Sequence, residues 1–256
     1  MDATAGRGRG VLVTGASRGI GRAVAGAFAQ AGDRVAVHWA TRRADAAETL
    51  AGLPGGGHVL VRGDLADPDR VEALVEEAAD GLGGIDVLVN NAAVMTPHPL
   101  PTTGYAAWQA AWRETAAVNL FGAANVSYCA ARHMIGRGAA GRIVNVGSRG
   151  AFRGEPDHPA YGATKAALHA LGQSLAVSLA PHGIAVTSVA PGFVATERVE
   201  DRLSGPGGAD IHAQSPFGRV ASAEEIAAAV LYLASPAAGW SSGAVLDVNG
   251  ASYLRT

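Results

Sequence analysis

The feature that most constrains the fold is an alternation of short apolar runs with longer alanine-rich stretches, which repeats along almost the whole chain. The clearest apolar runs are unbroken, as is typical of parallel strands that are covered on both faces. Seven runs are predicted to be strands: Val11–Val13, Val35–His38, Val59–Val61, Val87–Val89, Ile143–Val146, Ala185–Val189 and Val245–Val248. The pattern predicts an α/β fold of the Rossmann type, with a doubly wound parallel sheet of about seven strands flanked by helices.

Helix starts and loops are marked between these strands. Asp67 and Pro68 are typical of an N-cap and a first turn, and Ser222 and Glu225 have the spacing of a capping box. A cluster of glycine and proline at residues 204–208 lies in a longer loop late in the chain. Neither an internal repeat nor a linker interrupts the pattern, so we expect residues 1–256 to form a single domain.

Composition restricts the kind of protein and its partners. The formal net charge is −2 and 16% of the residues are charged, so no broad basic surface suited to nucleic acid is implied. Cys129 is the single cysteine, which excludes a disulfide within the chain and fits a reducing, cytoplasmic setting. The N-terminus lacks the apolar segment of a secretory signal and no run of 18 apolar residues occurs, so we expect a soluble protein without a membrane partner.

Other chemistries lack their sequence signatures. The eight histidines have no metal-ligand spacing, so no metal site is expected. A Gly-x-Ser-x-Gly elbow is missing as well, which argues against an α/β-hydrolase. Four histidines are predicted to be surface or partly buried polar residues: His38, His133, His169 and His182.

A glycine-rich turn, Thr14-Gly-Ala-Ser-Arg-Gly-Ile-Gly21, connects the first predicted strand to the first predicted helix. Glycines there leave backbone N–H groups bare at the helix N-terminus, where the helix dipole favours an anion such as a pyrophosphate. The spacing of Gly15, Gly19 and Gly21 differs from the common Gly-x-Gly-x-x-Gly fingerprint. A tight turn that binds no ligand is therefore the alternative.

Four polar side chains are candidates for catalysis or for a purely structural role. Tyr161 and Lys165 are four residues apart on one face of a predicted helix, where an ammonium favours the phenolate and makes a tyrosine a usable acid near neutral pH. Ser148 follows a strand at its carboxyl end, which is the side of the sheet where α/β proteins bind ligands. Its hydroxyl can hydrogen-bond a substrate carbonyl. Taken alone, each of these residues more often serves packing, solvation or capping. Asn119 by itself indicates a polar residue that caps or kinks a buried helix.

Several motifs in register resemble those of the classical short-chain dehydrogenase/reductase family over almost the full length of the chain. Besides the glycine-rich turn, Asp64-Leu65 resembles the pair that contacts adenine, and Pro191-Gly192 with Thr196 resembles the segment that holds the nicotinamide. The likeness to 3-oxoacyl-acyl-carrier-protein reductases and related carbonyl reductases extends to Asn90-Asn91-Ala92-Ala93 and Val248-Asn249-Gly250. In two places an alanine stands where the family commonly has glycine, namely at Ala93 and Ala251.

The resemblance also implies catalytic roles. Asn119, Ser148, Tyr161 and Lys165 match the family's tetrad in order and spacing. The match implies that Tyr161 protonates the substrate oxygen, that Ser148 orients it, that Lys165 holds the ribose, and that Asn119 holds a water linking Lys165 to solvent. The expected activity is reduction of a ketone or aldehyde by NADPH. The alternatives are an alcohol or sugar dehydrogenase that works oxidatively on the same site, and a non-catalytic NADPH-binding regulatory protein.

The end of the second predicted strand bears on the choice of cofactor. NAD binding usually calls for an acidic residue there, but Thr41, Arg42 and Arg43 follow the strand and no Asp or Glu appears before Asp45. Arg18 is expected to face the same end of the sheet, and guanidinium groups suit a 2′-phosphate. NADP(H) is therefore the predicted cofactor. Its predicted contacts are Gly15, Ser17, Arg18, Gly19, Ile20, Gly21, Ala40, Thr41, Arg42, Asp64, Leu65, Asn91, Tyr161, Lys165, Pro191, Gly192, Val194 and Thr196.

No motif identifies the substrate or the assembly directly. Residues 149–158 and a lid loop at residues 193–217 are expected to line the pocket for a small carbonyl or alcohol compound, although Glu155 and His158 are predicted to lie in a surface loop. A helix that is apolar over most of its circumference needs cover beyond its own sheet, and a subunit interface would provide it. The resemblance to the family implies a homotetramer, or a dimer. The helix concerned carries Tyr161 and a stripe of Leu168, Leu171, Leu175 and Leu179.

Overall fold

The computed structural model describes residues 8–197 and 199–255, and a sheet of seven parallel strands forms its centre. The strands are β1 (Gly10–Val13), β2 (Arg34–Trp39), β3 (Val59–Arg62), β4 (Val87–Asn90), β5 (Gly141–Val146), β6 (Ile184–Pro191) and β7 (Val245–Val248). Their order is β3-β2-β1-β4-β5-β6-β7, so that β1 pairs with β2 on one side and with β4 on the other. The predicted doubly wound α/β fold is confirmed, and each predicted strand lies within an observed one.

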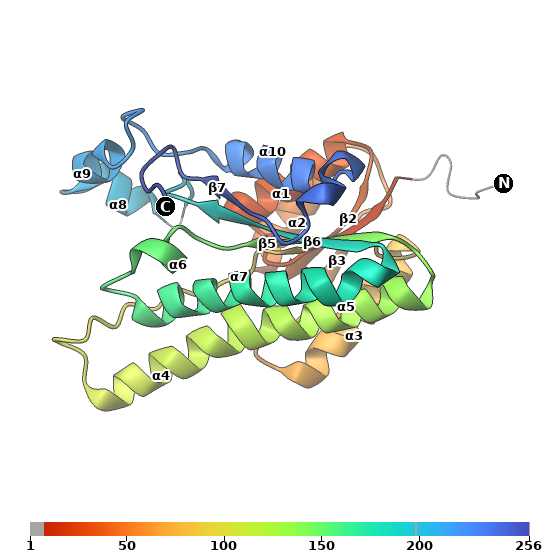
Figure 1. Ribbon diagram of the computed structural model, residues 1–256, viewed down its shortest axis with the longest axis horizontal. Helices are drawn as coiled ribbons and strands as arrows, with labels where there is room; N and C mark the ends of the chain where they lie inside the picture. Colours follow the sequence, from red (N-terminus) through yellow and green to blue (C-terminus); the bar gives the residue numbers. More distant parts are fainter. Residues whose placement is uncertain (1–7, 198, 256) are drawn as a thin grey trace.

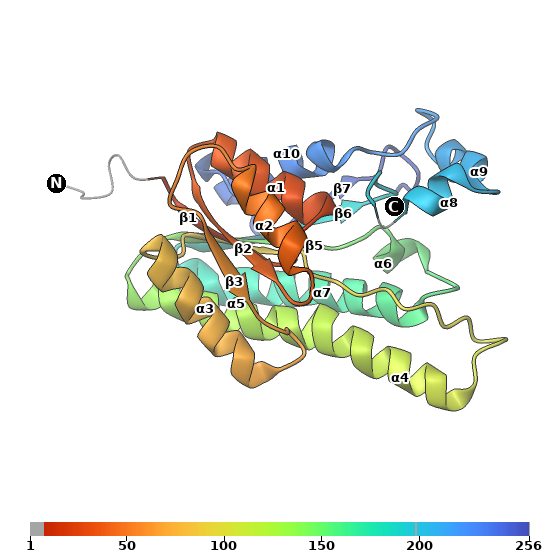
Figure 2. The same cartoon turned by 180° about the vertical axis from the view of Figure 1, so that it is seen from behind.

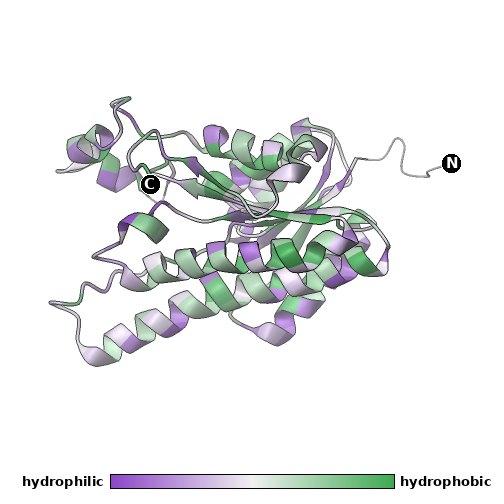
Figure 3. Ribbon diagram, viewed as in Figure 1, coloured by the Kyte–Doolittle hydropathy of each residue, from purple (hydrophilic) through white to green (hydrophobic). Residues whose placement is uncertain are grey.

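The longer helices form two layers, one on each face of the sheet (Figures 1 and 2). One layer contains α1 (Gly19–Gln30), α2 (Arg43–Ala51) and α10 (Ala223–Leu233). The other contains α3 (Pro68–Leu82), α4 (Tyr105–Ala116), α5 (Ala123–Gly136) and α7 (Pro159–Leu179). A buried apolar cluster fills the space between each layer and the sheet. Figure 3 shows hydrophobic residues along α5 and α7 as well as in the strands.

Both predicted helix starts are confirmed. Asp67 accepts a hydrogen bond of 3.1 Å from the backbone N–H of Asp69, and Pro68 is the first residue of α3. At α10, the Ser222 hydroxyl accepts the N–H of Glu225 at 3.2 Å, and the Glu225 carboxylate accepts the N–H of Ser222 at 2.8 Å. These caps satisfy N–H groups that have no partner inside the helix.

The helix that precedes β5 is irregular at its centre. A π-helical segment, η1 (Ala117–Gly122), joins α4 to α5 without a break (Figure 1). Asn119 lies in this segment and is 0% exposed. The segment thus interrupts the α-helix at Asn119, as one-turn π segments do.

Short elements gather beyond the carboxyl ends of the strands. They are α6 (Gly150–Arg153), α8 (Glu200–Ser204) and α9 (Gly208–Ala213), on the left of Figure 1. Two 3₁₀ segments complete the described elements, η2 (Ala180–His182) and η3 (Pro236–Ser241). Across the described ranges, no helix has the length and apolar character needed to cross a membrane.

Two of the histidine predictions are wrong. His38 is 1% exposed and His169 is also buried, because His38 belongs to β2, which pairs with β1 and β3, and His169 packs against Gly147 at the end of β5. His133 is half-buried and His182 is exposed, as predicted.

Candidate active site

A cleft of about 580 Å³ opens at the carboxyl ends of the strands. It lies where the chain crosses from one side of β1 to the other, which is the place where doubly wound sheets bind ligands. All residues predicted to contact the cofactor line this cleft, and so does Ser148. Asn119 is the one member of the predicted tetrad that does not line it. The structure thus brings together residues from positions 15 to 196 of the chain.

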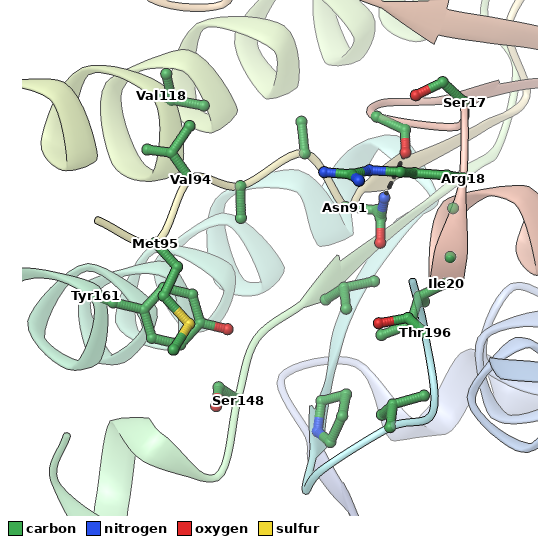
Figure 4. Close-up of a pocket in the computed structure, with 18 of the residues that line it drawn as sticks. Ser17, Arg18, Ile20, Asn91, Val94, Met95, Val118, Ser148, Tyr161 and Thr196 are labelled. Carbon is green, nitrogen blue, oxygen red and sulfur yellow. Dashed lines mark hydrogen bonds between the residues drawn. The ribbon is translucent and has the colours of Figure 1, made fainter. Parts of the chain in front are cut away.

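The glycine-rich turn is locked against the end of β4. The Asn91 side-chain amide donates to the backbone oxygens of Thr14 and Gly15 at 2.9 and 3.0 Å. Figure 4 shows this amide beside the turn, with one of its hydrogen bonds as a dashed line. A Cβ atom on Gly15 would lie 2.8 Å from Ala92 Cα, and one on Gly21 would lie 2.2 Å from the Gly15 oxygen. Only glycine allows these approaches, and Gly15 also has a positive φ of 65°.

Helix α1 begins directly at this turn. Its N-cap residue, Arg18, makes no capping hydrogen bond with its side chain, and the first residues of this 12-residue helix, Gly19, Ile20 and Gly21, line the cleft. A glycine cradle at the positive end of a helix fits the pyrophosphate of a dinucleotide. This fit is the structural argument for a dinucleotide in the cleft.

His38 supports the turn from β2, a role that sequence reasoning missed. Its Nδ1 accepts the Gly15 N–H at 2.9 Å, which leaves the proton on Nε2 to be donated to the Gly63 oxygen at 3.0 Å. Burial lowers the pKa of His38 to about 4, so the ring is neutral at physiological pH. The sequence offered one signal, a histidine within an otherwise unbroken apolar strand.

Lys165 and Tyr161 lie one helical turn apart on α7. The Lys165 ammonium is buried, donates to the Val146 oxygen at 2.7 Å, and lies 5.6 Å from the centre of the Tyr161 ring. Ser148 follows the end of β5, and its hydroxyl oxygen accepts the Gly150 N–H at 2.9 Å. Figure 4 shows Ser148 close to the Tyr161 ring in the view, with the Tyr161 hydroxyl directed away from α7, and both residues line the cleft.

Asn119 fastens the segment that follows β4. Its side-chain oxygen accepts the Val94 N–H at 2.8 Å, and its amide nitrogen donates to the Val94 oxygen at 2.9 Å and to the Thr164 hydroxyl at 3.3 Å. The side chain thereby connects η1 to the cleft wall and to α7. The structure thus gives Asn119 a positioning role, and the proton relay stays a prediction.

The prediction of a surface loop for Glu155 and His158 is wrong. Glu155 is half-buried and lines the cleft, and burial raises the pKa of its carboxyl group. His158 is buried, and burial lowers its pKa. The loop folds back on itself because the His158 N–H donates to the Glu155 oxygen at 3.0 Å, and it is held to a second loop by the His98 N–H, which donates to the Asp157 oxygen at 2.9 Å.

The predicted lid, residues 193–217, of which residue 198 lies outside the described residues, borders two pockets. Its first part lines the main cleft through Phe193, Val199 and Arg202. Its last part, with Gln214 and Phe217, lines a smaller pocket of about 330 Å³. Sequence reasoning did not name Arg202, nor the apolar residues Met95 and Val118 on the opposite wall of the cleft, because none of them belongs to a motif.

Arg18, Thr41 and Arg42 line the end of the cleft near β2. Arg42 contacts Asp45 at 3.5 Å, and both residues lie on the solvent side. No carboxylate from residues 40–42 enters the cleft, because none of these residues is acidic. This end therefore fits a phosphorylated ribose by charge.

Comparison with known proteins agrees with the fold. The profile of a family described as enoyl-(acyl carrier protein) reductase matches residues 15–251. The chain is 36% identical over 251 residues to L-rhamnose 1-dehydrogenase (NAD(P)(+)) of Sphingomonas sp. (strain SKA58), covering 97% of both chains. It is 37% identical over 249 residues to the 3-oxoacyl-acyl-carrier-protein reductase of Escherichia coli (strain K12), covering 96% of this chain and 98% of that one.

A solved structure is also similar along the whole chain. A mutant short-chain dehydrogenase/reductase of Serratia marcescens superposes with a TM-score of 0.86 and 32% sequence identity, covering 96% of this chain and 98% of the other. With the sheet order, the glycine cradle and the tyrosine–lysine pair, these matches settle the family. The chain belongs to the short-chain dehydrogenase/reductase family, oxidoreductases that act on alcohol or carbonyl groups with NAD(H) or NADP(H).

Proposed function

We propose that this protein reduces a ketone or aldehyde to an alcohol with NADPH, with Tyr161 as the proton donor. The observation that carries the proposal is that Tyr161 and Ser148 line one cleft that also contains the glycine cradle (Figure 4). Lys165, held by Val146, adds a buried positive charge beside the tyrosine. Together these groups match the needs of carbonyl reduction.

The residues divide the reaction between them. A bound nicotinamide supplies the hydride that the substrate carbon receives. Tyr161 gives its hydroxyl proton to the carbonyl oxygen as the C=O bond becomes single, and Lys165 stabilises the phenolate that is left. Because Ser148 Oγ accepts the Gly150 N–H, its own proton can point to the substrate oxygen and stabilise the charge that develops there.

The charge at the β2 end of the cleft supports NADPH rather than NADH. Arg18 and Arg42 line it, and Thr41 adds a hydroxyl donor. A carboxylate at this place would accept hydrogen bonds from a ribose 2′-hydroxyl and repel a 2′-phosphate. The chain instead offers two guanidinium groups, which bind phosphate with paired, charge-assisted hydrogen bonds.

The same site supports oxidation of an alcohol when pH and cofactor ratio favour it, as the name of the L-rhamnose relative indicates for that protein. We further propose a single cofactor-binding domain with residues 193–217 as substrate lid, working as a homotetramer. A regulatory protein that only binds NADPH would have no need of Tyr161 and Lys165, so we prefer the enzyme.

The decisive experiment follows absorbance of the reduced nicotinamide while a panel of ketones and aldehydes is added. Turnover by the wild-type protein, lost in Tyr161→Phe, supports a carbonyl reductase. NADPH binding without turnover across the panel, in either direction of the reaction, contradicts it and favours the regulatory protein.

A further inference from the structure

Two arginines, Arg149 and Arg202, line the cleft, and a third, Arg153, shares a hydrogen-bond partner with Arg149. Arg149 directly follows Ser148, Arg153 ends α6, and Arg202 lies on α8 of the lid. The guanidinium groups of Arg149 and Arg202 both stack on the Phe193 ring, at 5.2 and 5.5 Å from its centre. Arg149 and Arg202 therefore reach the cleft wall from opposite elements and meet at one aromatic ring.

Arg149 is unusual in its burial and its partner. It is 5% exposed, and no other arginine in the described ranges is buried. Its guanidinium donates to the side-chain oxygen of Gln214, which also accepts a hydrogen bond of 2.7 Å from Arg153. A single neutral amide oxygen thus serves two positively charged groups.

Other arginines of this chain take carboxylate partners even at exposed positions. Arg70 pairs with Glu77 at 2.8 Å, and Arg219 pairs with Glu225 at 2.7 Å. Between residues 8–197 and 199–255, none of the ion pairs includes Arg149, Arg153 or Arg202. A buried guanidinium normally needs an anionic partner, because burial removes the water that would otherwise solvate its charge.

The carboxyl group of Glu155 does not neutralise the charge of these arginines. Glu155 lies close enough to influence the charges of all three arginines, but no ion pair joins it to any of them. Glu114 and Glu197 also line the cleft, and Glu114 accepts a hydrogen bond of 2.7 Å from the Thr96 hydroxyl. Among the described residues, no ion pair joins either of these acids to Arg149 or Arg202. Four apolar side chains, those of Val94, Met95, Val118 and Val199, form a large part of the remaining lining.

We propose that the substrate carries a carboxylate, that Arg149 and Arg202 bind it, and that an apolar carbon skeleton separates it from the reacting carbonyl. The inference rests on the proposed function and narrows its substrate to oxo acids. The planar fork of arginine matches a carboxylate, which is a stronger acceptor than the amide oxygen of Gln214. A polyol is disfavoured because the apolar wall would leave its hydroxyl groups without partners.

Binding of unreactive acids tests the inference without catalysis. Calorimetry on the wild-type protein saturated with NADP⁺ compares hexanoate with hexanamide and cyclohexanecarboxylate with cyclohexanecarboxamide. The acid of at least one pair should bind about tenfold or more tightly than its amide, since a charged hydrogen bond contributes this much. Failure of both acids to bind more tightly than their amides overturns the inference.

Two variants assign the effect to the arginines. Arg202→Gln, at an exposed position, and Arg149→Gln should each remove most of the preference for the acid. Arg70→Gln, on α3 and outside the cleft, should keep it. If Arg149→Gln does not fold, Arg202→Gln alone decides, and an unchanged preference in that variant counts against the assignment.

Turnover separates this inference from the proposed function. Levulinate should be reduced with a kcat/KM about tenfold or more above that of methyl levulinate, chiefly through a lower KM. If acid and ester are reduced equally well, and acids and amides bind equally tightly, the proposal of a carboxylate substrate is wrong while the proposed reductase activity holds. If acids bind more tightly than their amides but no carbonyl compound is reduced, the proposed reductase activity is wrong while the proposed carboxylate site holds.

Discussion

Lys165 Nζ donates a hydrogen bond of 2.7 Å to the backbone oxygen of Val146, which ties the centre of α7 to the end of β5. Tyr161 lies one helical turn before Lys165, and Ser148 lies two residues after Val146. The bond thereby fixes the two hydroxyl groups relative to one another on rigid elements, as a site for proton donation requires. Because Lys165 is 2% exposed, its charge acts on Tyr161 with little screening by water.

Tyr161→Phe should abolish nearly all turnover and keep the fold. The change deletes one hydroxyl from a half-buried ring, and proton donation typically contributes about 10² to 10⁴-fold to the rate. Circular dichroism and NADPH fluorescence titration are expected to match the wild type, while kcat falls by at least about a hundredfold. Turnover within about threefold of the wild type would remove Tyr161 from the mechanism.

Two glycines on α1 should respond in opposite ways to alanine. A Cβ at Gly21 would lie 2.2 Å from the Gly15 oxygen and 2.6 Å from the Asn91 amide, whereas a Cβ at Gly26 meets nothing within 4 Å. Gly21→Ala should lower both Tm and NADPH affinity. Gly26→Ala, the matched control, should keep the affinity and raise the stability by about 0.5–1 kcal/mol. Equal NADPH affinity in the two variants would contradict the close-approach argument.

The fold and most of the site could be predicted from the sequence because local signals report them. Unbroken valine-rich runs marked the strands, and the glycine turn and the Tyr161–Lys165 spacing marked the cleft, since each depends on residues close together in the chain. His38, Glu155 and Arg202 were missed because their surroundings come from distant segments. His38 forms hydrogen bonds with Gly15 and Gly63, which lie more than 20 residues away in the chain, and no local pattern reports these bonds.

Ala251 has a backbone conformation that glycine adopts more easily than alanine. Ala251, which stands where the family commonly has glycine, has a φ of 57°, the one positive φ among the described non-glycine residues. The chain thus retains the left-handed turn that glycine would adopt more easily.

Two buried histidines should make the protein less stable in mild acid. Burial lowers the pKa of His38 and of His169 from 6.5 to about 4, so an unfolded chain binds protons in this interval that the folded chain does not. The stability that depends on keeping these two rings neutral is therefore fully present above pH 6.5 and is lost as the pH falls towards 4. Between pH 7 and 5 the free energy of unfolding should fall by about 2 kcal/mol for each histidine.

Urea denaturation at pH 7 and pH 5 checks this pH dependence. His169→Leu and His38→Asn should each flatten it, whereas His182→Gln, at an exposed histidine, should leave it as in the wild type. The same steep dependence in all four proteins would show that other groups cause it.

Assembly should involve two separate faces. Leu168 and Leu179 are buried within the chain, so the leucine stripe of α7 covers the sheet in part, but Tyr128 on α5 and Val177 on α7 are exposed. On the opposite side, Tyr232 and Trp240 are exposed on α10 and η3. Two apolar faces suit a tetramer with two kinds of interface. Light scattering at micromolar concentration should give a tetramer for the wild type and a smaller species for Trp240→Asp, and a wild-type monomer would contradict the prediction.

Cofactor preference depends on the arginine in the glycine-rich turn. Arg18 is half-buried at the start of α1 and lines the cleft with Thr41 and Arg42, where no acidic residue stands to repel a 2′-phosphate. The wild type should prefer NADPH to NADH by at least roughly tenfold in kcat/KM, which corresponds to about 1.4 kcal/mol. Arg18→Ala should raise the KM for NADPH and leave the KM for NADH nearly unaffected, because only the phosphorylated ribose loses a charged partner.

Arg43→Ala provides the control, since Arg43 is exposed, lies next to Arg42 and does not line the cleft. Equal use of the two cofactors by the wild type, or equal effects of the two substitutions, would show that charge at this end of the cleft does not select the cofactor.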